Sequence, residues 1–85
     1  MYFVYVLQSK KDSRYYYGLT RDLENRLKEH NNKSVPSTKA RAPLALMYFE
    51  EVETLALARK REKYFKSGFG RKYVKGKIEH KGPIV

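Results

Sequence analysis

The chain has 85 residues, no Cys and a formal net charge of +10. A chain this short forms one domain around a compact core, without room for a second. The lack of Cys excludes disulfides and thiolate zinc sites, and two His residues argue against a His-based metal cage. No window approaches the roughly 18 apolar residues of a membrane span, so we expect a soluble cytoplasmic protein without membrane contact.

Two strands joined by a hairpin are predicted at the N-terminus. Residues 2–8 are apolar on both alternating faces, which is typical of a central strand covered on both sides. Residues 9–13 form a polar turn, and residues 14–19 resume the strand pattern. Gly18, near the end of the second strand, either lets another group approach closely or simply terminates the strand.

A helix and a long loop follow. Thr20 or Asp22 can cap a helix that runs to about residue 30, and its periodicity places Arg26 and His30 beside the apolar stripe. Both side chains therefore face the edge of the sheet. Residues 31–43 contain turn formers, hydroxyls and cations without periodicity, which indicates a long loop of the kind that often carries function.

A third strand and a second helix complete the predicted core. Residues 44–52 have strand character, and Thr54 is expected to cap a helix over residues 55–66. Glu62 lies at the border of the apolar face of that helix. A carboxylate there needs compensation, from Arg61, from Lys66 or from a bound metal.

The C-terminal segment is rich in Gly and basic residues. Gly68 is expected to end the second helix in a left-handed cap. Residues 71–78 form either a short third helix or an irregular basic segment, because Gly76 disfavours a helix. We expect residues 1–80 to form the domain and residues 81–85 a loose tail.

The positive charge is concentrated in the C-terminal third. Residues 1–56 carry nine Lys/Arg and seven Asp/Glu (net +2), whereas residues 57–85 carry ten and two (net +8). Such a segment suits a polyanion, because each phosphate contact releases condensed counterions. The alternative is an ordinary solvated helix face.

The chemistry-bearing residues favour phosphodiester cleavage. The chain has no Gly-rich phosphate loop, no Cys nucleophile and no His-Glu-x-x-His helix. What remains is Tyr, Arg, His and one semi-buried Glu. A carboxylate can hold a divalent metal against a phosphate, a guanidinium can stabilise the pentacovalent state, and a phenol or imidazole can activate water.

These residues also occur in the order of a known family. Phe3-Val4-Tyr5, then Tyr16-Tyr17-Gly18, then Arg26 and His30, and a late helix bearing Glu62, resemble the GIY-YIG endonuclease domain. The resemblance covers about residues 2–75. It is closest to small stand-alone bacterial members, related to the nuclease domain of the excision-repair incision subunit and to intron homing endonucleases. It implies an α/β (α+β) fold with a three-stranded antiparallel sheet flanked by helices.

The resemblance also assigns roles to single residues. It implies that Glu62 holds one Mg²⁺ or Mn²⁺, that Arg26 neutralises the scissile phosphate, and that a tyrosine, with or without His30, activates water. It leaves open which phenol, Tyr5 or Tyr16, is the base. Gly18 becomes the closing glycine of the motif.

Two positions depart from the family pattern. Phe3 replaces the first motif glycine, a change that is tolerable because its side chain can enter the core. Leu19 stands where the repair enzymes carry a lysine, so any help from that lysine in lowering a phenol pKa is missing. Either catalysis is weaker here or His30 compensates.

The sequence therefore supports a metal-dependent DNA endonuclease linked to repair or processing. It is expected to act on particular structures or single strands, because 85 residues leave no separate module for reading a long sequence. The alternatives are a nucleic-acid-binding protein whose catalysis has decayed, such as a repair-complex component, and a protein-interaction domain. The residues expected to contact phosphates are Ser37, Thr38, Lys39, Arg41, Arg59, Lys63, Lys66, Arg71 and Lys72.

Each catalytic candidate also has an ordinary structural reading when taken alone. A strand tyrosine more often fills the core or its rim. Arg26 has Asp22 one turn earlier as a salt-bridge partner, and Glu62 has neighbouring cations. His30 can act as a cation at the helix C-terminus. Only their joint occurrence in this order makes the catalytic reading the better one.

Overall fold

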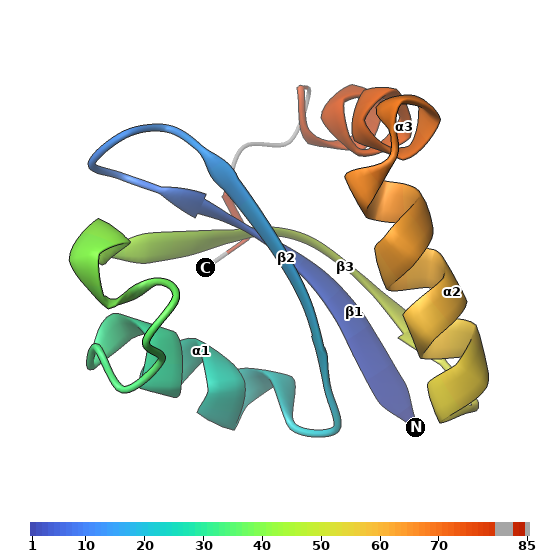
Figure 1. Cartoon of the computed structure of the whole chain (residues 1–85), viewed down its shortest axis with the longest axis horizontal. Coiled ribbons are helices and arrows are strands. Elements are labelled where there is room, and N and C mark those ends of the chain that lie inside the picture. Colours follow the sequence, from blue (N-terminus) through green and yellow to red (C-terminus); the bar gives the residue numbers. More distant parts are fainter. Residues whose placement is uncertain (80–82, 85) are drawn as a thin grey trace.

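The structure, a computed structural model, describes residues 1–79 and 83–84. Its sheet is antiparallel with strand order β2-β1-β3, and helices lie on both of its faces (Figure 1). This confirms the predicted α+β fold. The elements are β1 (Tyr2–Ser9), β2 (Tyr15–Thr20), α1 (Leu23–Asn31), a short 3₁₀ helix (Lys39–Arg41), β3 (Leu44–Val52), α2 (Leu55–Lys66) and α3 (Gly68–Ile78).

Strand β1 is central because its residues are apolar on both sides. Val4 and Val6 point to the face covered by α2 and α3, whereas Tyr5 and Leu7 point to the face covered by α1. All four side chains are at most 3% exposed. The two faces thus bury two separate apolar clusters.

Each cluster joins one set of helices to the sheet. The larger cluster lies between the sheet and α2 and α3, and the smaller one lies between the sheet and α1 (Figure 1). The buried members of the larger cluster are Val4, Val6, Ala45, Met47, Ala58, Phe65, Val74 and Ile78. The smaller cluster contains Tyr5, Leu7, Leu44 and Leu46, with Tyr16, Leu23 and Leu27 packed against them.

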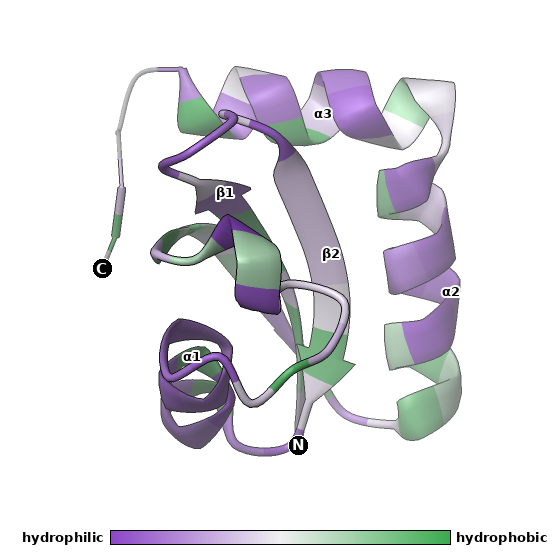
Figure 2. Cartoon of the chain, turned by 60° about the vertical axis from the view of Figure 1, so that its left-hand side comes forward, coloured by the Kyte–Doolittle hydropathy of each residue, from purple (hydrophilic) through white to green (hydrophobic). Residues whose placement is uncertain are grey.

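Helices α2 and α3 are separated by a single residue. Ser67 is extended (φ −78°, ψ 165°) and serves both as the C-cap of α2 and as the N-cap of α3, where its Oγ accepts a hydrogen bond from the Gly70 N–H at 3.1 Å. The predicted left-handed cap at Gly68 is therefore wrong, because Ser67 makes the break and Gly68 already belongs to α3. Residues 71–78 are helical, which decides between the two readings of that segment. The two helices form an L over one face of the sheet (Figure 2).

Gly70 permits the close approach of α3 to the last turn of α2. A Cβ at Gly70 would lie 1.7 Å from the Tyr64 carbonyl oxygen and 2.8 Å from the Phe65 Cα, both backbone atoms. We expect Gly70→Ala to lower the free energy of unfolding by about 3 kcal/mol, since the backbones must separate. The matched control is Gly76→Ala, because a Cβ at Gly76 meets nothing within 4 Å. This change should raise the free energy of unfolding by about 0.5–1 kcal/mol, since Ala favours the helix more than Gly does. Urea unfolding measures both, and equal effects would contradict the packing argument.

An ion pair fixes α2 to β3. Arg61 donates from Nε to Glu50 Oε1 at 2.7 Å and from Nη2 to Oε2 at 3.1 Å, and the Tyr48 hydroxyl donates to Oε2 at 2.6 Å. The Arg61 guanidinium also lies over the Tyr73 ring, 4.9 Å from its centroid. Burial alone would raise the pKa of Glu50, but the hydrogen bonds from Arg61 and Tyr48 hold it below its usual value. Arg61 is thus committed to Glu50 and does not compensate Glu62.

Two further expectations concern the chain ends. Phe3 does not enter the core: it stays half-buried and packs edge-on against Phe49, with ring centroids 6.0 Å apart. The predicted loose tail lies largely outside the described residues, although the Ile84 N–H donates to the Leu46 carbonyl at 2.7 Å. Among residues 1–79 and 83–84, no helix has the length and apolar character that crossing a membrane requires.

Candidate active site

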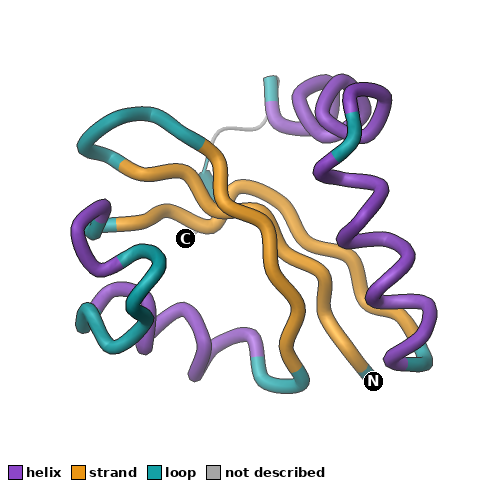
Figure 3. The backbone as a smooth tube through the Cα atoms, viewed as in Figure 1, coloured by secondary structure: helices purple, strands orange, loops and turns teal. Residues whose placement is uncertain are grey.

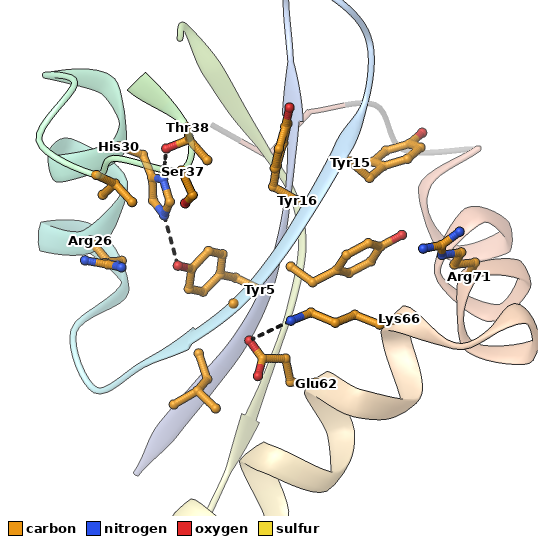
Figure 4. A pocket seen from close by; sticks show the side chains of 14 residues that line it. Tyr5, Tyr15, Tyr16, Arg26, His30, Ser37, Thr38, Glu62, Lys66 and Arg71 are labelled. Atoms are coloured by element: carbon orange, nitrogen blue, oxygen red, sulfur yellow. Dashed lines mark hydrogen bonds and ion pairs between the residues drawn. The ribbon is translucent and has the colours of Figure 1, made fainter. Parts of the chain in front are cut away.

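A cleft of about 490 Å³ opens at the edge of the sheet formed by β2. Its wall combines residues from both sides of β2: α1 and the following loop on one side, α2 and α3 on the other (Figure 4). All residues predicted to be catalytic line this cleft, namely Tyr5, Tyr16, Arg26, His30 and Glu62. Residues separated by up to 57 positions in the chain therefore share one wall.

Gly18 lets the Tyr5 ring reach the cleft. The two residues are direct partners across β1 and β2, and a Cβ at Gly18 would lie 2.4 Å from the Tyr5 hydroxyl oxygen and 2.5 Å from Cζ. The phenol thus lies across the bare backbone of the edge strand. Of the two readings of Gly18, close approach of another group is the correct one.

His30 is held between two hydroxyls. Its Nε2 lies 3.0 Å from the Tyr5 hydroxyl oxygen, and its Nδ1 lies 2.7 Å from Thr38 Oγ1. The loop between α1 and β3 folds back beside α1 (Figure 3). Thr38 of this loop thereby reaches the imidazole. Because both partners are hydroxyls, either ring nitrogen can carry the proton of the neutral imidazole.

The environment keeps His30 neutral. The ring is 4% exposed, and this burial, together with the nearby Arg26 charge, lowers the pKa of His30 below 6.5. The reading of His30 as a cation at the helix terminus is therefore wrong. A buried neutral imidazole with a phenol on one nitrogen can instead accept a proton from that phenol.

The pH dependence of stability tests this state of His30. Below pH 6.5 the unfolded chain binds a proton at His30 more readily than the folded chain, so the free energy of unfolding falls as the pH drops through this region. For each tenfold difference in proton affinity of His30 between the unfolded and the folded chain, the free energy of unfolding falls by at most about 1.4 kcal/mol. We expect the fall between pH 6.5 and 5.5 to be smaller in His30→Gln, measured by urea unfolding at each pH. Identical pH profiles would contradict a buried neutral His30.

Tyr5 and Arg26 form the other part of the α1 side. Burial raises the pKa of the Tyr5 phenol above 10, and the Arg26 guanidinium offsets only part of this effect. Tyr5 is thus a neutral hydroxyl rather than a preformed phenolate. Arg26 pairs with Glu29 at 3.6 Å and not with Asp22, whose carboxylate accepts from the Asn25 N–H and caps α1.

Glu62 supplies the negative charge from the opposite side of β2. Its side chain is 24% exposed and lies 3.8 Å from the Lys66 Nζ, so Lys66 is the compensating cation (Figure 4). Glu62 is the one carboxylate that lines the cleft, and no group of three or more His, Cys, Asp or Glu converges anywhere in the described residues. A single carboxylate fits Mg²⁺ or Mn²⁺ when water and phosphate oxygens complete the shell, as Mg²⁺ commonly requires.

Tyr16 lines the same cleft in a different orientation. Its hydroxyl points away from the contact between Tyr5 and His30 (Figure 4). Its ring packs partly against the smaller apolar cluster. Of the two motif phenols, only Tyr5 thus has an imidazole as hydrogen-bond partner in the described part of the chain.

The predicted phosphate contacts divide into two groups. Ser37, Thr38, Lys66 and Arg71 line the cleft, and the Thr38 hydroxyl already contacts His30. The others lie outside its wall. Arg41 pairs with Asp12 at 3.1 Å, Lys39 lies in the 3₁₀ helix, and Arg59, Lys63 and Lys72 are exposed on α2 and α3.

The sequence interpretation missed several lining residues. Tyr15 and Tyr17 of β2 and Val35 of the loop also face the cleft. The three consecutive tyrosines at residues 15–17 could have predicted this lining. Successive residues of a strand point to opposite faces of the sheet, and along the unpaired side of an edge strand the side chains of both faces are accessible. Glu50 was also missed as a partner of Arg61, since nothing local in the sequence joins β3 to α2.

Comparison with known proteins agrees with this α+β fold. The family model described as "GIY-YIG catalytic domain" matches residues 1–74. The chain belongs to the GIY-YIG nuclease family. No solved structure gives a significant match.

Several similar proteins carry the same kind of name. "UPF0213 protein CPE1444" of Clostridium perfringens (strain 13 / Type A) is 43% identical over 67 residues, covering 78% of this chain and 71% of that protein. "UPF0213 protein YazA" of Bacillus subtilis (strain 168) is 41% identical over 66 residues, 76% of this chain and 66% of that protein. "UPF0213 protein BLi00048/BL00536" of Bacillus licheniformis is 41% identical over 81 residues, 94% and 81% respectively.

Proposed function

We propose that this protein is a metal-dependent endonuclease that hydrolyses phosphodiester bonds in DNA. The observation that carries the proposal is the convergence of Tyr5, His30, Arg26 and Glu62 on one cleft across the edge strand. Each of these groups has a use in phosphoryl chemistry, and family membership supports a nucleic-acid substrate. The net charge of +10 favours association with a polyanion.

Glu62 would hold a single Mg²⁺ or Mn²⁺. Such an ion polarises a phosphoryl oxygen and lowers the pKa of bound water. Lys66 must then leave Glu62, and its ammonium becomes free to contact a phosphate oxygen. Its present distance of 3.8 Å from the carboxylate is that of a weak, half-exposed pair, which is easily exchanged.

Tyr5 and His30 would move the proton of the attacking water. Because the Tyr5 pKa is raised, a standing phenolate is not the starting state. The phenol can instead donate its proton to His30 Nε2 while its oxygen accepts a proton from water, so no charged phenolate accumulates. Thr38 holds the ring at Nδ1 during this transfer.

Arg26 would stabilise the phosphate in the transition state. Its guanidinium lies on the α1 side of the cleft, opposite Glu62, and is held by Glu29 at 3.6 Å in a partly exposed pair. In this position the guanidinium can stabilise the extra negative charge of the pentacovalent phosphate. The cleft thus supplies positive charge from α1 and a metal-binding carboxylate from α2.

The substrate is proposed to be a particular DNA structure or a single strand, handled during repair or processing in the cytoplasm. The described residues form one sheet with its helices, so nothing among them resembles a second module for base readout. Contacts from Ser37, Lys66 and Arg71 would go to the backbone, which positions a strand without selecting its sequence.

Cleavage of labelled duplex, flap and single-stranded DNA tests the proposal. The parent is expected to cut at least one substrate with Mg²⁺ or Mn²⁺ and none in EDTA. Arg26→Ala should lower the rate by about 100- to 1,000-fold. Lys28→Ala, an exposed cation on the same helix, is the control and should cleave like the parent. Equal rates for parent and Arg26→Ala would sink the assignment.

The second candidate is a nucleic-acid-binding protein with weak or no catalysis. Two observations favour it: the raised pKa of Tyr5, and Leu19 at the position where repair enzymes carry a lysine. It predicts salt-sensitive DNA binding without cleavage under any divalent metal. The same substrate panel therefore separates the two candidates.

A further inference from the structure

A second recess lies beside the main cleft, on the outer side of β2. It has a volume of about 450 Å³ and is lined by Arg14, Tyr15, Tyr17 and Arg71. Three of these residues, all except Arg14, also line the main cleft, so the two hollows adjoin each other. Figure 4 shows Tyr15 and Arg71 on the side of β2 opposite to Arg26 and His30. A strand bound at the catalytic residues would therefore enter this recess next.

Two guanidiniums face this recess without a carboxylate. Arg14 directly precedes β2, Arg71 lies in the first turns of α3, and both are exposed. Within the described residues neither of them forms an ion pair. The nearby Asp12 is engaged instead, by the Arg14 backbone N–H at 2.9 Å and by Arg41 at 3.1 Å. Two cations sharing one recess repel each other until an anion binds between them.

The two tyrosines provide fixed aromatic surface between the guanidiniums. Tyr15 and Tyr17 are half-buried and pack against the larger apolar cluster on one side. Their rings are thus held in place by the core while part of each faces the recess. Fixed aromatic rings next to basic groups are the usual platform for stacking the bases of an extended strand.

We propose that Arg14, Tyr15, Tyr17 and Arg71 form a second nucleotide subsite. Arg14 and Arg71 bind the phosphate next to the scissile one, and the tyrosine rings stack the base that it carries. The subsite rests on the proposed nuclease function and deepens it, because it fixes the side of the cut on which the DNA strand must continue. It also requires that base to be unstacked from any duplex.

Binding without metal tests the subsite apart from catalysis. Fluorescence anisotropy with labelled single-stranded DNA in EDTA should show about tenfold weaker binding for Arg14→Gln than for the parent. The plot of log affinity against log salt concentration has a negative slope, and in Arg14→Gln this slope should become less steep by about 0.7. That is the value for one phosphate contact on a single strand. Lys11→Gln removes a charge from the same turn outside both hollows and should bind like the parent.

A walk of one abasic nucleotide along the strand tests the stacking. In the parent, one position near the cleavage site should cost about tenfold in affinity. In a Tyr15→Leu/Tyr17→Leu variant, the abasic strand should bind with the same affinity as the intact strand, because the stacking contact is already lost. Circular dichroism checks its folding. If that variant unfolds, the Arg14→Gln result alone decides.

The outcomes separate the subsite from the nuclease proposal. If the parent binds and cleaves DNA but Arg14→Gln binds as tightly as Lys11→Gln, the subsite is wrong and the nuclease stands. If the parent binds no DNA at low salt, both proposals fail. A shared loss of affinity in Arg14→Gln and the tyrosine variant, with Lys11→Gln unaffected, supports the subsite.

Discussion

Replacing Glu62 by Gln is expected to abolish most metal-dependent cleavage, lowering the rate by at least about 100-fold. Among the residues that the structure describes, Glu62 is the one carboxylate lining the cleft. The amide of Gln keeps the shape of the side chain while removing the charge that attracts a divalent ion. Folding should be preserved, because the side chain is partly exposed and its pair with Lys66 is long. Rates are measured under single-turnover conditions across a Mg²⁺ titration.

The control and the binding assay make the Glu62 result specific. Glu53→Gln removes a carboxylate that is exposed before α2 and lies outside the cleft, so it should cleave like the parent. Binding of DNA by Glu62→Gln in EDTA should be equal or tighter, because a negative charge near the phosphate is gone. Cleavage by Glu62→Gln at the parent rate would show that the metal does not depend on this residue.

Replacing Gly18 by Ala is expected to reduce cleavage by about 100-fold while the protein stays folded. The new Cβ would lie 2.4 Å from the Tyr5 hydroxyl oxygen, so the end of the Tyr5 side chain must move. That movement separates Tyr5 from His30, now 3.0 Å apart, and breaks the proposed proton path. The Tyr5 ring is buried and hydrogen-bonded to His30, so its displacement should lower the free energy of unfolding by about 1–3 kcal/mol.

Two tyrosine variants provide the comparison for Gly18→Ala. Tyr5→Phe removes the hydroxyl without a clash and should lose activity to a similar extent. Tyr16→Phe should retain more activity, because the Tyr16 hydroxyl points away from His30 (Figure 4). Cleavage assays and thermal melts of all three variants give the answer. Full activity in Gly18→Ala would mean that the position of the Tyr5 hydroxyl does not matter.

Local patterns were enough to predict most of the elements. Residues 44–52 and residues 55–66 were predicted as strand and helix, and β3 and α2 have these bounds. β1 is central as expected, because a strand that is apolar on both faces can be buried only between two layers. Thr54 caps α2 as predicted, since the cap depends on neighbouring residues alone.

The errors share a physical cause. The end of the second helix was predicted as a left-handed cap at Gly68, whereas the extended Ser67 caps both helices and Gly70 provides the close packing. The partner of Arg61 is Glu50, on a strand that is distant in sequence. The close packing at Gly70 and the Arg61–Glu50 pair follow from how α2 docks against α3 and β3, which no short window of sequence specifies.

The sequence by itself determined which chemical groups the chain carries and in what order. The spacing of Tyr5, Gly18, Arg26 and Glu62 along strands and helices indicated the family, and the match to the family model confirms it. Only the tertiary structure decided that Tyr5 crosses Gly18 to meet a neutral His30, and that Glu62 arrives from the other side of β2. These contacts depend on strand register and on two helices docking at one sheet edge, which are set by long-range packing rather than by local pattern.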